Sequence, residues 1–134
     1  MKRSQARDWA FKLIFESQFK PELSANDIYD SAESIEDFEK DAYMCTVFEG
    51  VLSSIDELDA TISKYAAGWS SDRISKVSLA ILRLSLYEMR HLDDVPMSVS
   101  INEAVELAKK YDTDNAPSFI NGILNSIAKA ENLK

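Results

Sequence analysis

The chain has 134 residues, 46% of them hydrophobic, and its 23 acidic and 15 basic side chains give a formal net charge of −8. This composition is that of a globular protein rather than a disordered one, and the length suits one domain with a sizeable core. The single cysteine, Cys45, excludes an internal disulfide and a multi-cysteine metal site, and no apolar run approaches the ~20 residues of a membrane span. The charged N-terminus does not resemble a signal peptide, so we expect a soluble, cytoplasmic protein.

The first predicted helix begins at a cap on Ser4 and runs to about Phe19, before Pro21. Phe11, Phe15 and Phe19 follow one another at a spacing of four residues, which places an aromatic stripe along one face of the helix. Such a stripe is usually part of the core. Phe15 reaches a ligand surface only if the neighbouring helices leave it uncovered.

The first helix is also the basic part of an acidic chain. Residues 1–20 carry five basic and two acidic side chains, residues 21–62 carry one and twelve, and residues 63–134 carry nine of each. A basic end on an acidic body can bind RNA, weakly and with strong salt dependence. A solvated helix end that is basic by chance is the alternative, and the charge distribution alone leaves both open.

Two further helices are predicted before residue 54. A short acidic helix covers residues 24–34, and a longer one starts at about Ile35. Cys45 lies within the apolar pattern of the longer helix and is expected to be a buried thiol. Gly50 weakens this helix and suggests that another helix approaches it closely.

The next helix begins at Ser54, which forms a capping-box pattern with Glu57. Gly68 is expected to end it, and Trp69 is expected to plug the core from the following connection. The acidic run that precedes and includes this helix is typical of a solvated face, and we assign it no role.

A central helix is predicted from Ile74 to about His91. Its apolar residues form two stripes on different sides, which indicates burial by neighbours on both of them. Arg83 and Glu88 interrupt these stripes, and two interpretations are open: they form structural ion pairs, or one edge of the helix faces a partner protein. His91 is expected to be exposed or ion-paired rather than metal-binding or catalytic.

The last two predicted helices cover residues 101–110 and 118–130. Ser100 and Glu103 match a capping box at the start of the first, and a polar connection from Tyr111 separates the two. Gly122 suggests close approach of another backbone. Because nothing alternates with period two, the chain is predicted to be all-α, a single compact domain of about seven helices over residues 1–134.

The sequence holds no pattern typical of catalysis. It has no glycine-rich phosphate loop, no paired histidine spacing and no Cys/His cluster, and with one histidine and one apparently buried cysteine the usual nucleophile–base pairs are absent. We therefore predict no enzyme activity, no cofactor and no metal site. Residue patterns alone indicate a small helical binding or scaffold module.

Five stretches match a known family pattern: Ala6-Arg7, Ile81 to Glu88 (ILRLSLYE), Asp94-Val95-Pro96, Ser100 to Lys109 (SINEAVELAK) and Phe119 to Leu124 (FINGIL). The last two blocks are specific together, in this order and at this spacing. The chain thus resembles the NusB family of bacterial transcription antitermination factors over essentially its whole length, with residues 20–60 the weakest part.

This resemblance implies two packed helix bundles without catalytic activity. Members of the family bind NusE, which is also a small-subunit ribosomal protein, and the pair binds the boxA element of nascent ribosomal RNA leaders. The complex assembles on RNA polymerase with NusA and NusG. We expect no further domain, which would separate the chain from RNA methyltransferases with a similar N-terminal domain. Some members self-associate, so a homodimer is possible.

The resemblance also suggests the binding residues. The family's RNA-facing positions, together with the basic start of the first helix, correspond to Lys2, Arg3, Arg7, Phe15, Tyr111, Asn115, Ser118 and Phe119. The expected NusE-facing positions on the central helix are Ser78, Leu79, Arg83 and Tyr87. For Phe119 a core position is the stronger alternative, and for Arg83 and Tyr87 the alternatives are an ion pair and a buried ring.

Two departures from the family pattern lead to rival functions. Ser4 and Gln5 interrupt the family's arginine-rich start, so fewer phosphate contacts and weaker RNA affinity are expected. Ser78-Leu79 stands where relatives often carry charge, and an exposed Leu79 would suit an apolar interface. The rivals are a protein-only scaffold or homodimer that has lost RNA binding, and a noncatalytic partner of an RNA-modifying enzyme.

Overall fold

The computed structural model describes residues 1–35, 37–66 and 74–133. These residues form seven α-helices and no strand, as predicted: α1 (Arg3–Ser17), α2 (Ala25–Ala32), α3 (Ala42–Ser53), α4 (Ile55–Tyr65), α5 (Lys76–His91), α6 (Met97–Tyr111) and α7 (Ala116–Ala130). None of the helices among them is long and apolar enough to cross a membrane. The expectations for Gly68 and Trp69 lie outside the described residues.

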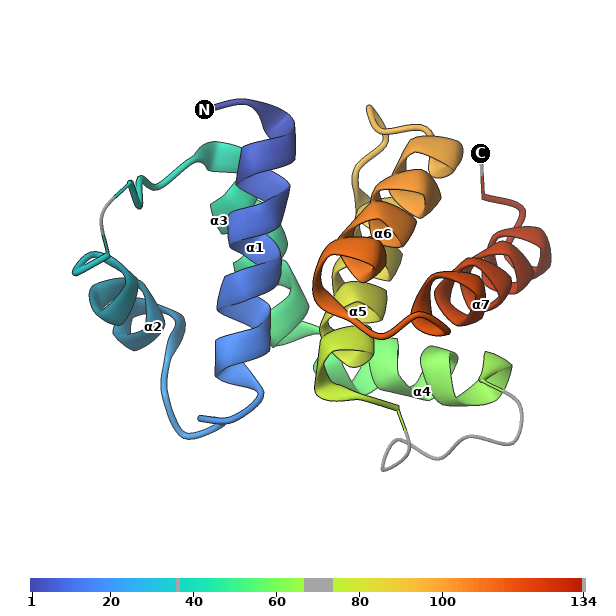
Figure 1. Cartoon of the computed structure of the whole chain (residues 1–134), viewed down its shortest axis with the longest axis horizontal. Coiled ribbons are helices and arrows are strands. Elements are labelled where there is room, and N and C mark those ends of the chain that lie inside the picture. Colours follow the sequence, from blue (N-terminus) through green and yellow to red (C-terminus); the bar gives the residue numbers. More distant parts are fainter. Residues whose placement is uncertain (36, 67–73, 134) are drawn as a thin grey trace.

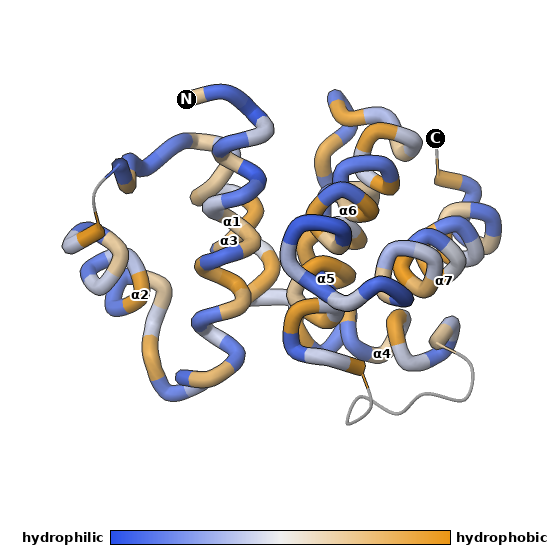
Figure 2. Tube along the Cα trace, in the orientation of Figure 1, coloured by the Kyte–Doolittle hydropathy of each residue, from blue (hydrophilic) through white to orange (hydrophobic). Residues whose placement is uncertain are grey.

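The helices form two groups that meet at α5. Helices α1 to α3 lie on one side and α4 to α7 on the other (Figure 1). Helix α5 packs against α1 and α3 of the first group and against α4, α6 and α7 of the second. Eleven of its sixteen residues are buried, which explains the two apolar stripes of its sequence. The tube of Figure 2 is accordingly hydrophobic along much of α5 and hydrophilic in the connection between α6 and α7.

Several helices begin at other residues than predicted, for local reasons. Helix α3 starts at Ala42 instead of Ile35, because the carboxylate of Asp41 accepts the backbone N–H of Met44 at 3.0 Å and caps the helix there. Helix α1 starts at Arg3, so Ser4 lies inside it and is not its cap. Cys45 is half-buried rather than buried.

Helix α6 starts one turn earlier than its capping-box pattern predicted. Pro96 precedes its first turn, and Ser100 lies inside the helix. The hydroxyl of Ser100 donates to Oε1 of Glu88 at 2.6 Å instead of capping. The predicted capping box at Ser100 is therefore wrong.

Glu88 is the centre of a buried polar network that joins four helices. Its carboxylate is 0% exposed and accepts hydrogen bonds from the side chains of Arg7 on α1, Tyr43 on α3 and Ser100 on α6. The guanidinium of Arg7 approaches through two nitrogens, at 3.1 and 3.2 Å. Burial alone would lower the pKa of Arg7, but the hydrogen bond to Glu88 and the charge interactions with Tyr43, Glu88 and Glu103 together outweigh burial and raise that pKa.

The ion-pair interpretation of the central helix is confirmed for both of its charges. Glu88 pairs with Arg7, and the guanidinium of Arg83 binds both carboxylate oxygens of Asp59 on α4, at 2.8 and 2.7 Å. His91 is exposed at the end of α5, also as predicted.

The two helix glycines differ in their surroundings. A Cβ added at Gly50 would lie 2.1 Å from Cζ of Tyr87, so the predicted close approach of another helix is confirmed there. A Cβ at Gly122 would meet nothing within 4 Å, so the same prediction for Gly122 is wrong.

Replacement of Glu88 by Gln should destabilise the protein strongly, because it leaves the buried Arg7 without its counter-charge. We expect a loss of about 3 kcal/mol in the free energy of unfolding, measured by urea denaturation at unchanged m value. Glu33→Gln, at an exposed position after α2, serves as the matched control and should change little. A loss below ~1 kcal/mol for Glu88→Gln would show that Glu103, 3.7 Å from Arg7, suffices as a partner.

The two glycines should respond in opposite directions to alanine. Gly50→Ala forces the Tyr87 ring to move and should lower the unfolding free energy by ~1–3 kcal/mol. Gly122→Ala adds a methyl group in open space inside α7 and should raise it by ~0.5–1 kcal/mol. The same denaturation experiment measures both, and a stabilising Gly50→Ala would contradict the close packing of α3 on α5.

Candidate nucleic-acid interface

The aromatic stripe of α1 passes from the core to the surface. Phe11 is buried, Phe15 is half-buried and Phe19, just beyond the helix end, is 56% exposed. The rings touch in sequence: the centroids of Phe11 and Phe15 are 6.0 Å apart and those of Phe15 and Phe19 are 5.1 Å apart. The neighbouring helices therefore leave part of the Phe15 ring uncovered, as a ligand surface at this residue would require.

Tyr111, at the end of α6, extends the stripe from another part of the chain. Its ring stacks on Phe11 with centroids 4.9 Å apart and an interplanar angle of 23°. Its hydroxyl donates to Oδ1 of Asp8 on α1 at 2.7 Å. Tyr111 is half-buried, so the ring is held firmly and still meets solvent.

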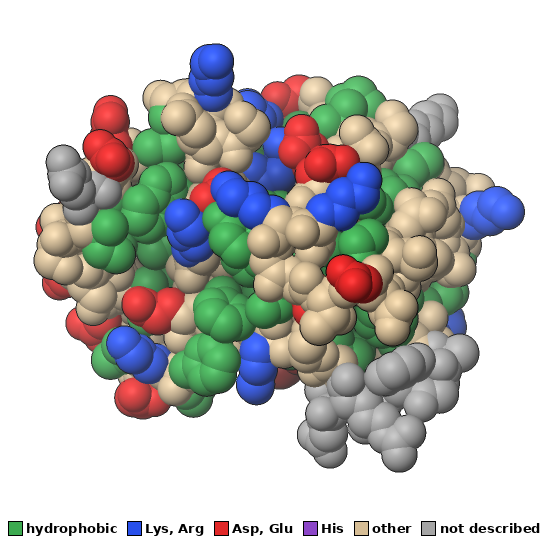
Figure 3. Space-filling model, in the orientation of Figure 1, with side chains coloured by type: hydrophobic (Ala, Val, Ile, Leu, Met, Phe, Trp, Pro, Cys, Tyr) green, Lys and Arg blue, Asp and Glu red, His purple; other side chains and the backbone are tan. Residues whose placement is uncertain are grey.

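Three lysines surround these rings. Lys12 of α1 and Lys110 of α6 place their Nζ atoms 3.0 and 3.1 Å from the two oxygens of Asp8, and Lys76 of α5 lies over the Phe19 ring at 5.9 Å. We call Lys12, Phe15, Phe19, Lys76, Lys110 and Tyr111 the aromatic–lysine surface. Figure 3 shows basic side chains around hydrophobic ones in the middle of this face.

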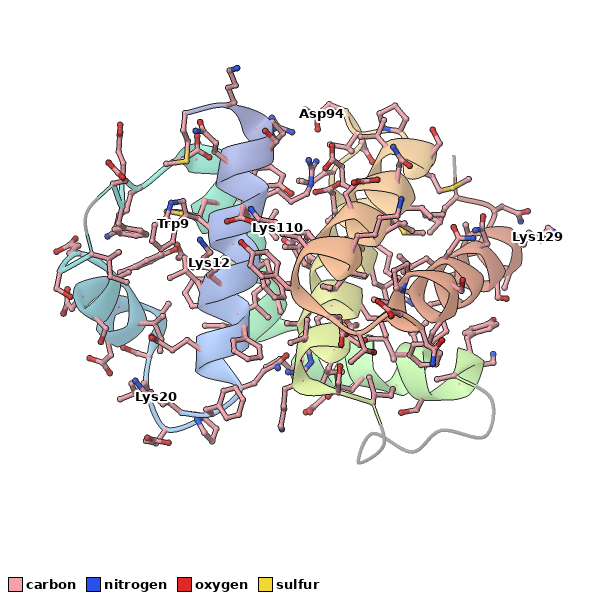
Figure 4. All side chains as sticks on the ribbon, viewed as in Figure 1. Trp9, Lys12, Lys20, Asp94, Lys110 and Lys129 are labelled. Atoms are coloured by element: carbon pink, nitrogen blue, oxygen red, sulfur yellow. The ribbon has the colours of Figure 1, made fainter. Side chains whose placement is uncertain are left out.

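The aromatic–lysine surface combines the two kinds of side chain with which proteins commonly bind single-stranded RNA. Partly exposed rings stack with splayed bases, and lysine ammonium groups bind phosphates. In Figure 4 the labelled Lys12 and Lys110 lie close together near α1 and the end of α6, whereas Lys129 lies at the far end of α7. The surface therefore occupies one face of an otherwise acidic molecule.

Asp8 is the acidic centre of this basic surface. Its partial burial alone would raise its pKa, but the hydrogen bonds from Tyr111, Lys12 and Lys110 outweigh burial, and the pKa of Asp8 is lowered. The carboxylate is therefore ionised at neutral pH and ties two lysines and one tyrosine together.

The start of α7 lines a small hollow near Tyr111. Asn115 and Phe119 line it together with Ser78 and Asp112, and Asp112 accepts the hydroxyl of Ser75 at 3.0 Å. Asn115 is exposed and Phe119 half-buried, so Phe119 is less completely covered than a core residue. The connection between α6 and α7 is in this way fixed to the start of α5.

The comparison with known proteins identifies the family. The model of the NusB family matches residues 4–129. The chain is 45% identical over 132 residues to the transcription antitermination protein NusB of Acetivibrio thermocellus, covering 98% of this chain and 91% of the relative. The chain belongs to the NusB family.

Solved structures of NusB proteins agree with this assignment. NusB of T. maritima superposes with a TM-score of 0.86 at 34% identity, over 96% of this chain and 92% of that chain. A chain in the crystal structure of the antitermination factors NusB and NusE with double-stranded RNA superposes with a TM-score of 0.82 at 29% identity, over 97% and 99% of the two chains. Both carry the same helical fold.

Most of the residues that the NusB resemblance suggested for RNA are accessible. Lys2 and Arg3 are exposed at the start of α1, where the Arg3 guanidinium lies 4.5 Å from the Tyr43 ring centroid. Ser118 is exposed in the first turn of α7. Phe15 and Tyr111 are brought together through Phe11.

The expectation that Arg7 is accessible to RNA is corrected by the structure. It is only 3% exposed and its guanidinium is bound to Glu88, so it does not face an RNA phosphate. Its role in this structure is to hold α1 against α5.

Three of the four NusE-facing residues expected on α5 are occupied inside the protein. Leu79 is buried, and the expectation that it is exposed is wrong. Ser78 is buried and donates to Asp112, and Arg83 is bound to Asp59 and to Oε1 of Gln18 at 3.1 Å. Tyr87 is half-buried, and its ring packs on His91 with centroids 4.6 Å apart. The exposed part of this segment is its first turn, at Lys76.

Sequence reasoning missed Asp8, Lys12, Lys76 and Lys110. The signal for Lys12 was present, because it lies four residues after Asp8 and three before Phe15 on the same helix. Lys76 and Lys110 join the surface only through the packing of α5 and α6, which no local pattern reveals.

We expect the carboxyl group of Asp8 to titrate below the ~3.9 of an unperturbed aspartate. Since the folded pKa lies below the unfolded one, Asp8 stabilises the fold above the unfolded pKa, and this contribution is lost as pH falls through the folded pKa. An NMR titration of side-chain carboxyl carbons measures this pKa directly. Replacing both Lys12 and Lys110 by Gln should raise it, and an unchanged value would contradict the ion pairs.

Proposed function

We propose that the chain is a noncatalytic transcription antitermination factor that binds the boxA element of ribosomal RNA leaders together with NusE. In this proposal the complex assembles on RNA polymerase with NusA and NusG. The kinship with antitermination proteins and the fold shared with a chain crystallised with NusE and RNA support it. The observation that carries it is the aromatic–lysine surface.

The RNA strand lies, in this proposal, across α1 and the connection from α6 to α7. Tyr111 and Phe15 offer ring faces and edges to bases, and Lys12 and Lys110 bind phosphates. Lys2 and Arg3 extend the positive charge at one end, and Asn115 and Ser118 offer polar groups at the other. Because the chain as a whole is acidic, these few cations give weak binding on their own.

NusE contacts the far end of the same surface in this proposal, at Phe19 and Lys76. Phe19 is the most exposed large hydrophobic side chain among the described residues, which suits an apolar anchor. The amide of Gln18 donates to the backbone carbonyl of Lys76 at 2.8 Å and fixes the end of α1 to the start of α5. A basic partner held there enlarges the positive surface that the RNA meets, so binding of the two ligands is cooperative.

The double variant Lys12→Gln with Lys110→Gln should weaken boxA RNA binding by the NusE complex. Loss of two phosphate contacts should also flatten the slope of log affinity against log salt by at most about 1.4, at ~0.7 per contact on a single strand. Fluorescence anisotropy of labelled boxA RNA at three salt concentrations gives both numbers. Lys129→Gln, which removes one positive charge at the far end of α7, should leave affinity and slope nearly unchanged.

The wild-type complex is first compared on boxA and scrambled RNA, with and without NusE. Binding that strengthens with NusE and prefers boxA supports the proposal. A NusE complex that forms but retains no RNA would contradict it and favour a protein-only scaffold. Sedimentation of the chain alone tests whether it forms a homodimer.

A further inference from the structure

A negative charge in the middle of a surface for a polyanion needs a reason. Asp8 is that charge, and its oxygens lie 3.0 Å from Nζ of Lys12 and 3.1 Å from Nζ of Lys110. The two lysines are the cations that the proposed RNA-binding function assigns to phosphate. An anionic oxygen already occupies, in the free protein, a position between them.

The three partners of Asp8 differ in how easily they can leave it. The side chains of Lys12 and Lys110 are 45% and 62% exposed, whereas that of Asp8 is 16% exposed. Exposed ammonium groups on flexible stems can turn to another anion at little cost. Tyr111 cannot do so, because its ring is stacked on Phe11 while its hydroxyl donates to Asp8.

We propose that Asp8 is an internal substitute for an RNA phosphate, which holds Lys12 and Lys110 until RNA binds and then passes them to the backbone. This inference rests on the proposed RNA-binding function. Asp8 keeps the hydrogen bond from Tyr111 throughout, so the base-stacking ring does not move. Because the phosphate must compete with Asp8 for two lysines, the residue lowers the affinity of the chain alone and makes RNA binding depend on charge supplied by the partner.

The test is Asp8→Asn, since an asparagine oxygen can still accept from Tyr111 but no longer neutralises the lysines. Affinity for boxA RNA should rise roughly three- to tenfold, the size expected for releasing two exposed ion pairs. The salt dependence should steepen as well, and this steepening plus the flattening in the Lys12→Gln, Lys110→Gln variant should add up to about 1.4 in slope, at ~0.7 for each lysine. Scrambled RNA should gain by the same factor, because phosphate contacts carry no sequence information.

Two comparisons separate this effect from a general change of charge. Asp30→Asn removes the same charge from an exposed position on α2, which lies on the other side of α1 from α6 (Figure 1), and Asp30 forms no ion pair with any residue that the structure describes. It should change affinity by less than about twofold, since screening limits its reach. In the Lys12→Gln, Lys110→Gln background, Asp8→Asn should have no effect, because the lysines it releases are gone.

Lower affinity or an unchanged salt slope in Asp8→Asn would overturn the inference and leave Asp8 as a structural anchor of Tyr111. An equal gain in Asp30→Asn would overturn it as well. If wild-type protein binds RNA with NusE but Asp8→Asn brings no gain, only the role of Asp8 fails. If neither protein retains RNA at any salt concentration, the proposed function fails, and this inference fails with it.

Discussion

The structure depends on one buried carboxylate. Glu88 lies at the point where α1, α3, α5 and α6 meet, and it receives a hydrogen bond from each of the other three helices. A charge so deeply buried is tolerated only when it is paired and its oxygens are satisfied. Each of the three donors must therefore be in place, and this requirement fixes how the first helix group sits on the second.

The same network determines what α1 presents to solvent. The side chain of Arg7 points into the core toward Glu88. The neighbouring Asp8 therefore lies on a more exposed side of α1. Lys12, Phe15 and Phe19 follow Asp8 at intervals of four, three and four residues, which keeps them on one line along the surface. Helix α1 thus forms the buried ion pair on one side and part of the aromatic–lysine surface on the other. The orientation of α1 about its axis that brings Arg7 to Glu88 also exposes Lys12 and Phe15.

The sequence predicted the helices better than the contacts between them. Seven helices, the double-sided burial of α5 and the contact at Gly50 all follow from spacing within a short segment. Arg7 shows the limit of such reasoning. A basic residue near a basic N-terminus looks like a phosphate ligand, and the partner that buries it lies 81 positions further along the chain. Ser100 is similar, because its pattern marks a cap but its hydroxyl serves a carboxylate on another helix.

The candidate site could be only half predicted for the same reason. Phe15 and Tyr111 were suggested by the resemblance, yet the lysines that join them in the proposed RNA-binding surface come from α1, α5 and α6 and meet only after folding. The net charge of −8 did not reveal them, because a sum over the sequence does not say where the charges lie in the folded protein. What matters for an RNA strand is the charge within about one Debye length of its path, roughly 8–10 Å at physiological salt. Within that range the chain presents lysines whose charge Asp8 partly neutralises, and a partner that adds a few cations can change the sign of the balance.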